Sequence, residues 1–166
     1  MSELRLEAAL RILTRHGVEF VVVVGVAGVL HGSPFTTQDL DVVYHQTPAN
    51  AARLARATAE LEARYLDLAG RHIEPDAPKL ASLRVHLLET NCGRLDLSTS
   101  IPPDLSYGDL VAGAETQSLG GVRIHIVSLR TLIESKGLMG RPKDHYQLHY
   151  LRQLEAELRS DSGGDD

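Results

Sequence analysis

Cysteine, long apolar runs and excess positive charge are the three features that this sequence lacks. Its single cysteine, Cys92, cannot form an internal disulfide, which favours a reducing compartment. No apolar run approaches the roughly 20 residues that span a bilayer, so we expect no membrane contact. The N-terminal segment is amphipathic and carries acidic residues, unlike a signal peptide. Together these absences predict a cytoplasmic protein.

The charge balance is acidic. The 17 lysines and arginines against 22 aspartates and glutamates give a net charge of −5. A general DNA-coating protein needs a broad basic field to displace counterions from phosphates, so the acidic balance argues against that class. A local basic patch is still compatible with a nucleic-acid substrate, because Lys136, Arg141 and Lys143 lie close together in the sequence.

The hydropathy pattern predicts one α/β (α+β) domain over residues 1–159, followed by a disordered tail over residues 160–166. A chain of 166 residues is the size of one domain. Continuous or alternating apolar runs predict strands, and apolar residues at helical spacing predict helices. The expected strands are 20–24, 39–44, 83–89, 94–98 and 122–127. The expected helices are 4–15, 27–31, a long one opened by Thr47 and Pro48, 128–139 and 142–158, and residues 67–82 read as a loop. The core stripe of the long helix is expected to be Leu54, Thr58, Leu61 and Tyr65.

Two aspartates stand two positions apart on a predicted strand. Asp39 and Asp41 therefore leave the same face of that strand, while Leu40 and Val42 take the other. Two like charges side by side are unfavourable unless a positive group lies between them. Mg²⁺ held by one or two carboxylates and substrate phosphates fits this D-x-D pattern. The alternative is an edge strand whose acids merely face water.

A third carboxylate, Asp96, has the same orientation on another predicted strand. It alternates with Leu95 and Leu97, so it points to the polar face. With Asp39 and Asp41 it could complete a two-metal site, in which Asp96 would contact the catalytic ion and help deprotonate an attacking hydroxyl. Alone, it would be an ordinary surface acid.

Glycine and lysine residues give two further candidates. Gly25 follows a buried strand and precedes a helix, so its backbone N–H could face an anion. Lys136 falls seven residues after Leu129, on the apolar face of a predicted helix. It would either extend past the core to solvent or direct its ammonium at phosphates or at the carboxylates. His145 and His149 are one helical turn apart, but without a third ligand a solvated face is favoured over a metal pair.

Taken together, the motifs resemble the hallmark of the DNA polymerase β-like nucleotidyltransferase superfamily. Segment 24–34 (VGVAGVLHGSP) is similar to its glycine turn and helix, and the Asp39–Asp41 pair follows at the matching place. Segment 128–144 (SLRTLIESKGLMGRPKD) is similar to the C-terminal pattern of the minimal bacterial members, the AbiEii-type and type IV toxin nucleotidyltransferases. The resemblance covers most of residues 20–150.

The resemblance implies a mixed or antiparallel central sheet flanked by helices. It also implies transfer of a nucleoside monophosphate (NMP) from a nucleoside triphosphate (NTP) to a hydroxyl, with release of pyrophosphate. Asp39, Asp41 and Asp96 would be the catalytic carboxylates and the ligands of Mg²⁺, or of Mn²⁺ in its place. Gly25 and Val26 would cradle the triphosphate, and Lys136 would be the basic residue near it. The acceptor would be a tRNA 3′ end or a protein hydroxyl, and a cognate toxin or antitoxin would be the partner.

Two positions depart from the family pattern. Val24 replaces the first glycine of the turn, and Phe35 stands where relatives often carry a basic residue. The bulk of Val24 and the missing charge at Phe35 leave a second interpretation open, namely a degenerate, non-catalytic module of the same fold that binds a nucleotide or a partner.

Overall fold

The chain folds around one mixed seven-stranded sheet. The structure, a computed structural model, describes residues 5–32, 38–138 and 142–162. The strand order is β3-β4-β5-β2-β1-β9-β8. β1 pairs in parallel with β9, and β2 pairs in parallel with β5, while the other pairs are antiparallel. The strands are β1 (Phe20–Val23), β2 (Asp39–Tyr44), β3 (Arg64–Tyr65), β4 (Val85–Thr90), β5 (Gly93–Ser98), β8 (Glu115–Leu119) and β9 (Val122–Ile126). The predicted fold class is confirmed.

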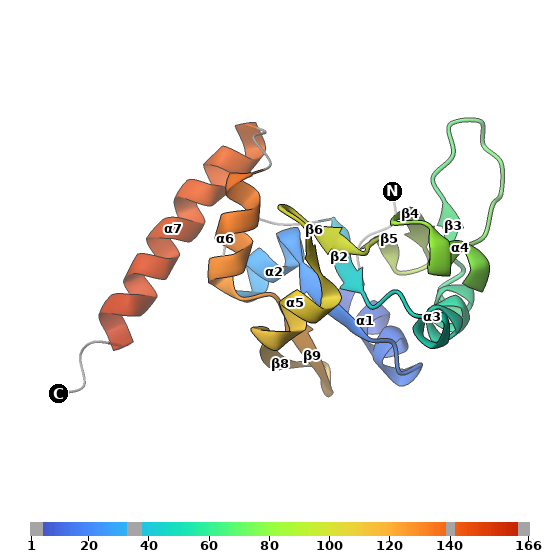
Figure 1. Cartoon of the computed structure of the whole chain (residues 1–166), viewed down its shortest axis with the longest axis horizontal. Coiled ribbons are helices and arrows are strands. Elements are labelled where there is room, and N and C mark those ends of the chain that lie inside the picture. Colours follow the sequence, from blue (N-terminus) through green and yellow to red (C-terminus); the bar gives the residue numbers. More distant parts are fainter. Residues whose placement is uncertain (1–4, 33–37, 139–141, 163–166) are drawn as a thin grey trace.

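In the part of the chain that the structure describes, seven helices and a small two-stranded sheet flank the large sheet. The helices are α1 (Leu6–Arg15), α2 (Val24–Leu30), α3 (Pro48–Glu60), α4 (Ala77–Ser82), α5 (Tyr107–Ala112), α6 (Leu129–Gly137) and α7 (Pro142–Ser162). The small sheet pairs β6 (Ser100–Ile101) with β7 (Leu105–Ser106). In Figure 1, α6 and α7 lie at one end of the large sheet, and β3, β4 and α4 lie at the other. None of the described helices is long and apolar enough to cross a membrane.

Local sequence signals set several helix boundaries. The side chain of Thr47 accepts a hydrogen bond from the backbone N–H of Asn50 and caps α3. Ser128 caps α6 in the same way through the N–H of Thr131. Gly17 follows α1 with a φ of +73°, a left-handed conformation that glycine adopts without steric penalty. These caps and this stop lie where the sequence predicts them.

The two faces of the sheet differ in polarity. On one face, Leu40, Leu95 and Leu97 are buried and join Leu10 of α1 and Leu54 of α3 in the core. On the other face, residues of β5 alternate with the buried ones and remain partly exposed, and residues of β4 are exposed. The polar face of β2 and β5 is therefore available for a site, because the core occupies the opposite face.

Some boundaries differ from the sequence prediction. The predicted loop at residues 67–82 contains α4, and Tyr65, the expected end of the core stripe on the preceding helix, belongs to β3 instead. Residues 100–119 form β6, β7, α5 and β8, none of which the hydropathy pattern revealed. Helix α7 continues to Ser162, so residues 160–162 are helical where a disordered tail was expected.

Candidate active site

Strand register brings the three predicted carboxylates together. In the parallel pair of β2 and β5, Asp41 lies opposite Asp96, and Asp39 lies opposite Arg94. The carboxyl groups of Asp41 and Asp96 share a hydrogen bond. The Nε of Arg94 donates to Oδ1 of Asp96 at 3.1 Å and lies 3.9 Å from Oδ2 of Asp39. Thus all three carboxylates lie around one guanidinium group.

The cluster carries more negative charge than Arg94 neutralises. Burial, and then the charges of Asp96 and Asp39, raise the pKa of Asp41 to about 7, against a weaker opposing effect of Arg94. Burial also raises the pKa of Asp96, although the hydrogen bond from Arg94 opposes this. The pair of hydrogen-bonded carboxyls therefore retains a proton near neutral pH. A further cation at this position would relieve the same repulsion.

The donor chemistry fits a hard divalent cation that shares its ligands with a substrate. Within residues 5–32, 38–138 and 142–162, no group of three or more His, Cys, Asp or Glu side chains is arranged to hold a metal ion. Mg²⁺ does not require such a cage, because it binds through one or two carboxylates and takes its remaining ligands from phosphates and water. The contact between Asp41 and Asp96 supplies two carboxylates on adjacent strands.

Arg94 is a site residue that the sequence reasoning missed. It is two positions before Asp96 on β5, so strand periodicity puts both side chains on the same face. A search for charged residues two positions from Asp96 on the same predicted strand would have found it. Sequence alone could not show that β5 pairs with β2, which is what places Arg94 between Asp39 and Asp96.

The predicted phosphate turn adjoins the carboxylates. Val23, the last residue of β1, lies opposite Asp41, and α2 begins at the next residue. The strand thus ends one residue earlier than predicted, and Gly25 lies in the first turn of α2. Val24 has a φ of +60°. That left-handed conformation is unfavourable for a β-branched residue by roughly 1–2 kcal/mol. The side chain of Val26 is buried, so only its backbone could face a ligand.

Lys136 is buried between helices and does not reach solvent. It is 3% exposed, and its Nζ donates to Oε1 of Gln147 on α7 at 2.8 Å. The alternative in which the lysine extends past the core to solvent is therefore wrong. Helix α6 packs on α2 as well as on α7, so Lys136 belongs to a helix that contacts the predicted phosphate turn. Its contact with a nucleotide phosphate stays a prediction, and Phe35, Arg141 and the glycine at 140 lie outside the described residues.

Three histidines and the single cysteine lie in surroundings typical of packing or surface residues. The Nε2–H of His31 donates to the carbonyl oxygen of Val127 at 2.8 Å, as expected of a packing histidine. Cys92 is buried and has a free thiol. His145 and His149 are exposed on α7, which agrees with a solvated face.

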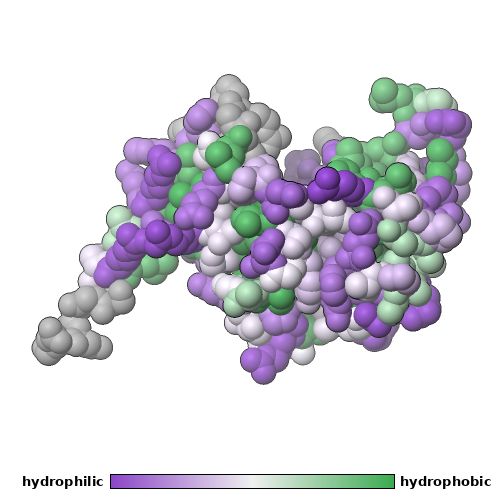
Figure 2. Space-filling model, viewed as in Figure 1, coloured by the Kyte–Doolittle hydropathy of each residue, from purple (hydrophilic) through white to green (hydrophobic). Residues whose placement is uncertain are grey.

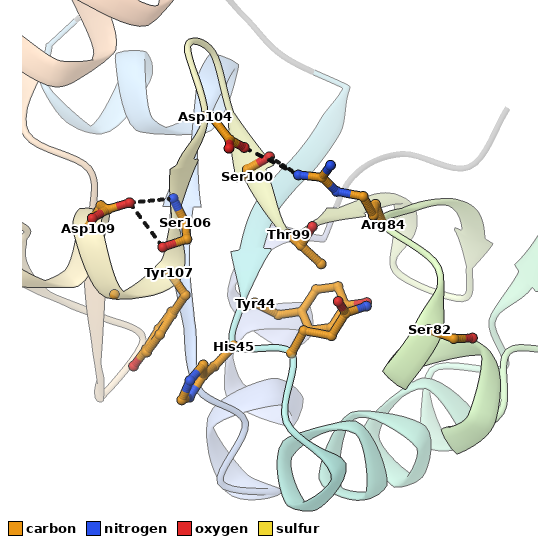
Figure 3. Close-up of a pocket in the computed structure, with 12 residues that line it drawn as sticks. Tyr44, His45, Ser82, Arg84, Thr99, Ser100, Asp104, Ser106, Tyr107 and Asp109 are labelled. Carbon is orange, nitrogen blue, oxygen red and sulfur yellow. Dashed lines mark hydrogen bonds and ion pairs between the residues drawn. The ribbon is translucent and has the colours of Figure 1, made fainter.

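A separate polar cavity of about 800 Å³ lies beyond the other end of β2 (Figure 3). Its walls include His45, whose ring stacks on Tyr107 with ring centres 4.9 Å apart. Arg84 closes one side through contacts with Asp104 at 3.3 Å and Ser100 at 3.4 Å. Among the described residues, none of those predicted from the sequence lines this cavity. Its walls come from several short segments, which no linear motif could reveal.

Comparison with solved structures identifies the fold. No protein-family model matches the sequence, and no curated protein sequence matches it either. The lincosamide antibiotic adenylyltransferase LnuA, solved with lincomycin bound, is similar with a TM-score of 0.62 and 12% identity, over 93% of this chain and 99% of that chain.

Two further solved structures show the same likeness. ANT(2″)-Ia in complex with adenylyl-2″-tobramycin gives a TM-score of 0.52 and 13% identity, over 93% of this chain and 94% of that chain. An antigenic nucleotidyltransferase-like protein from Paracoccidioides brasiliensis gives 0.58 and 17%, over 90% and 72%. The chain therefore has a nucleotidyltransferase fold. These similarities do not bear on the AbiEii-type subgroup.

Proposed function

We propose that this protein is a divalent-metal-dependent nucleotidyltransferase that moves an NMP from an NTP to a hydroxyl group. The observation that carries the proposal is the convergence of Asp39, Asp41 and Asp96 on one sheet face, with a pKa of about 7 at Asp41. Such a cluster is unfavourable by itself and is typical of sites that bind a cation or move a proton. The nucleotidyltransferase fold of the chain supports the same reaction.

Each of these residues would have a separate role in the reaction. A bound Mg²⁺ or Mn²⁺ would neutralise phosphate charge and help ionise the acceptor hydroxyl. Asp39 and Asp41 would hold it, and Asp96, oriented by Arg94, would accept the hydroxyl proton. The acceptor oxygen bonds to the α-phosphorus, the bond to the bridging oxygen breaks, and pyrophosphate leaves. Gly25, Val26 and Lys136 would contact the triphosphate, and a preorganised positive environment would stabilise its developing charge.

Three acceptor classes are compatible with this chemistry. The resemblance to AbiEii-type and type IV toxin proteins implies a tRNA 3′ end or a protein hydroxyl, with a cognate toxin or antitoxin as partner. The structural neighbours LnuA and ANT(2″)-Ia were solved with lincomycin and with adenylylated tobramycin, which adds a small-molecule hydroxyl. All three acceptors supply the same attacking group, so the carboxylates would act alike on each.

A label-transfer assay tests the proposal. Purified protein is incubated with Mg²⁺ and each of the four NTPs carrying the label at the α-phosphate, together with total tRNA, a protein extract and small-molecule alcohols. We expect the label in one acceptor class, no transfer with EDTA, and a loss of at least about 100-fold in Asp96→Asn, since this variant removes the proton acceptor. Equal transfer by Asp96→Asn and the parent would remove Asp96 from the site.

Two observations favour a second candidate, a non-catalytic nucleotide- or partner-binding module. Arg94 already contacts both Asp96 and Asp39, and no group of three acidic or histidine ligands is arranged for a metal in the described part of the chain. This candidate predicts that an NTP binds and is recovered unchanged. Slow release of pyrophosphate that depends on both Mg²⁺ and Asp41 would contradict it.

A further inference from the structure

One row of residues runs across the open face of the sheet and changes from acidic to apolar. Asp41 of β2 lies opposite Asp96 of β5, and Asp96 lies opposite Leu87 of β4. The backbone N–H of Leu66, which follows β3, donates to the carbonyl oxygen of Leu87 at 3.0 Å and continues the row. Neighbouring strands are about 4.8 Å apart, so apolar side chains begin about 5 Å from Asp96 and extend to about 10 Å.

These apolar side chains are exposed although the molecule has a complete core. Leu66 is 39% exposed, Leu87 is 42% exposed, and Val85, two residues before Leu87 on the same face, is 60% exposed. We call these three residues the apolar shelf. Figure 2 shows apolar surface in the upper right, over β4 and the segment after β3. A contiguous exposed apolar patch beside polar groups is more often a binding site for another molecule than a chance exposure.

The shelf lies on the accessible side of the carboxylates. At the opposite end of the row, Val23 of β1 lies beside Asp41 and is 1% exposed. Helix α2 packs against both β1 and β2 there. Among the described residues, the row is therefore closed toward β1 and open toward β4, so a molecule whose hydroxyl reaches Asp96 would extend toward β4. Its remainder would lie on Leu87 and Leu66.

From this geometry we infer that the acceptor is a small amphipathic alcohol, whose hydroxyl meets Asp96 while an apolar ring or chain lies on the shelf. The inference rests on the proposed function and names the substrate class of the same site. Charge on this face argues against RNA. Arg94 of β5, Arg64 of β3 and Arg84 beside Val85 contact Asp96, Glu89 and Asp104, and the protein has a net charge of −5. Phosphate binding would need basic side chains in excess over acidic ones.

A pair of alkyl glucosides tests the inference, because methyl and hexyl β-glucoside carry the same sugar hydroxyls and differ only in apolar length. Binding is measured by NMR titration with the protein as it is and with Leu87→Ser and Val85→Ser. Leu158→Ser on α7 is the matched control, since Leu158 is likewise exposed, at 50%, and lies far from the shelf in the sequence. We expect hexyl glucoside to bind at least about tenfold more tightly than the methyl compound to the parent and the control. In the shelf variants the preference should fall to about twofold.

Rates of label transfer to the same two glucosides separate this inference from the proposed function. A faster transfer to hexyl glucoside that disappears in Leu87→Ser supports both. Transfer to tRNA or protein without any alkyl preference in binding overturns the shelf and leaves the nucleotidyltransferase intact. Alkyl preference in binding with no transfer to any acceptor overturns the proposed function and supports the shelf as a binding surface. Self-association that Leu87→Ser abolishes, with equal binding of both glucosides, overturns the shelf as an acceptor site.

Discussion

At the scale of single residues, the site is defined by a charge imbalance. Three carboxylates face one guanidinium, and the excess charge is partly removed by a proton on Asp41, whose pKa is about 7. The sequence predicted that Asp39 and Asp41 share a face and that Asp96 points away from the core, because a strand has a side-chain period of two. Strand parity could also have placed Arg94 beside Asp96, but its contact with Asp39 depends on which strands pair.

The first prediction concerns stability against pH. Asp41 binds a proton more tightly in the folded state than in the unfolded state, where its pKa is 3.8. The free energy of unfolding should therefore fall as pH rises from about 4 to about 7, and the loss persists above that range. Asp41→Asn removes this effect and should be more stable than the parent at pH 8 without metal, by about 2–4 kcal/mol.

Urea unfolding at several pH values with EDTA checks this, with Asp161→Asn on exposed α7 as the control. Excess Mg²⁺ should stabilise the parent at pH 8 and leave Asp41→Asn unchanged, since a ligand that binds only the folded state stabilises it. Identical pH profiles for the parent and Asp41→Asn would show that protonation of Asp41 does not cause the change in stability with pH.

The second prediction concerns Lys136. Replacing it with methionine keeps most of the side-chain volume and removes the charge that now contacts Gln147. We expect little change in thermal stability and a weakening of NTP binding by about 1–3 kcal/mol, the usual size of a charge-assisted hydrogen bond. Calorimetric titration with NTP measures it, and Lys79→Met, at an exposed lysine paired with Asp76, is the control. Unchanged affinity in Lys136→Met would mean that the phosphates bind elsewhere.

At the scale of elements, the turn from β1 to α2 is predicted correctly in kind but placed a few residues off. The buried strand, the following glycine and the short helix are all present, but the helix begins at Val24 rather than after Gly25. Val24 has the left-handed backbone that explains why a glycine suits this position. Such a conformational detail cannot be seen in a hydropathy pattern, because the pattern reports burial and not φ.

The third prediction follows from that backbone. Val24→Ala and Val24→Gly remove the same packing except for one methyl group, but only glycine relieves the left-handed strain. We expect Val24→Gly to be more stable than Val24→Ala by about 1 kcal/mol, opposite to the usual order of these residues at a helix. Thermal and urea unfolding of the two variants measure the difference. A more stable Val24→Ala would mean that the turn relaxes to an ordinary conformation.

At the scale of the whole molecule, long periodic segments predicted most of the sheet. The strands β1, β2, β4, β5 and β9 and the helices α1, α3, α6 and α7 all lie near their expected positions. The missed elements are short or polar: α4 has 6 residues, β6 and β7 have 2 each, and β8 reads Glu-Thr-Gln-Ser-Leu. Such elements form through tertiary contacts, and these leave no periodic signal in the sequence. The cavity at His45 and Tyr107 was missed for the same reason.

A crystal structure with Mg²⁺ and an NTP analogue that cannot be cleaved between its α- and β-phosphates tests the central claim most directly. We predict a metal ion on Asp39 and Asp41 with Asp96 adjacent, the triphosphate at the start of α2 near Gly25, and Arg94 moved away from at least one carboxylate. A nucleotide bound in the cavity beside Tyr44 and His45, or one bound with no metal at the carboxylates, would contradict the account.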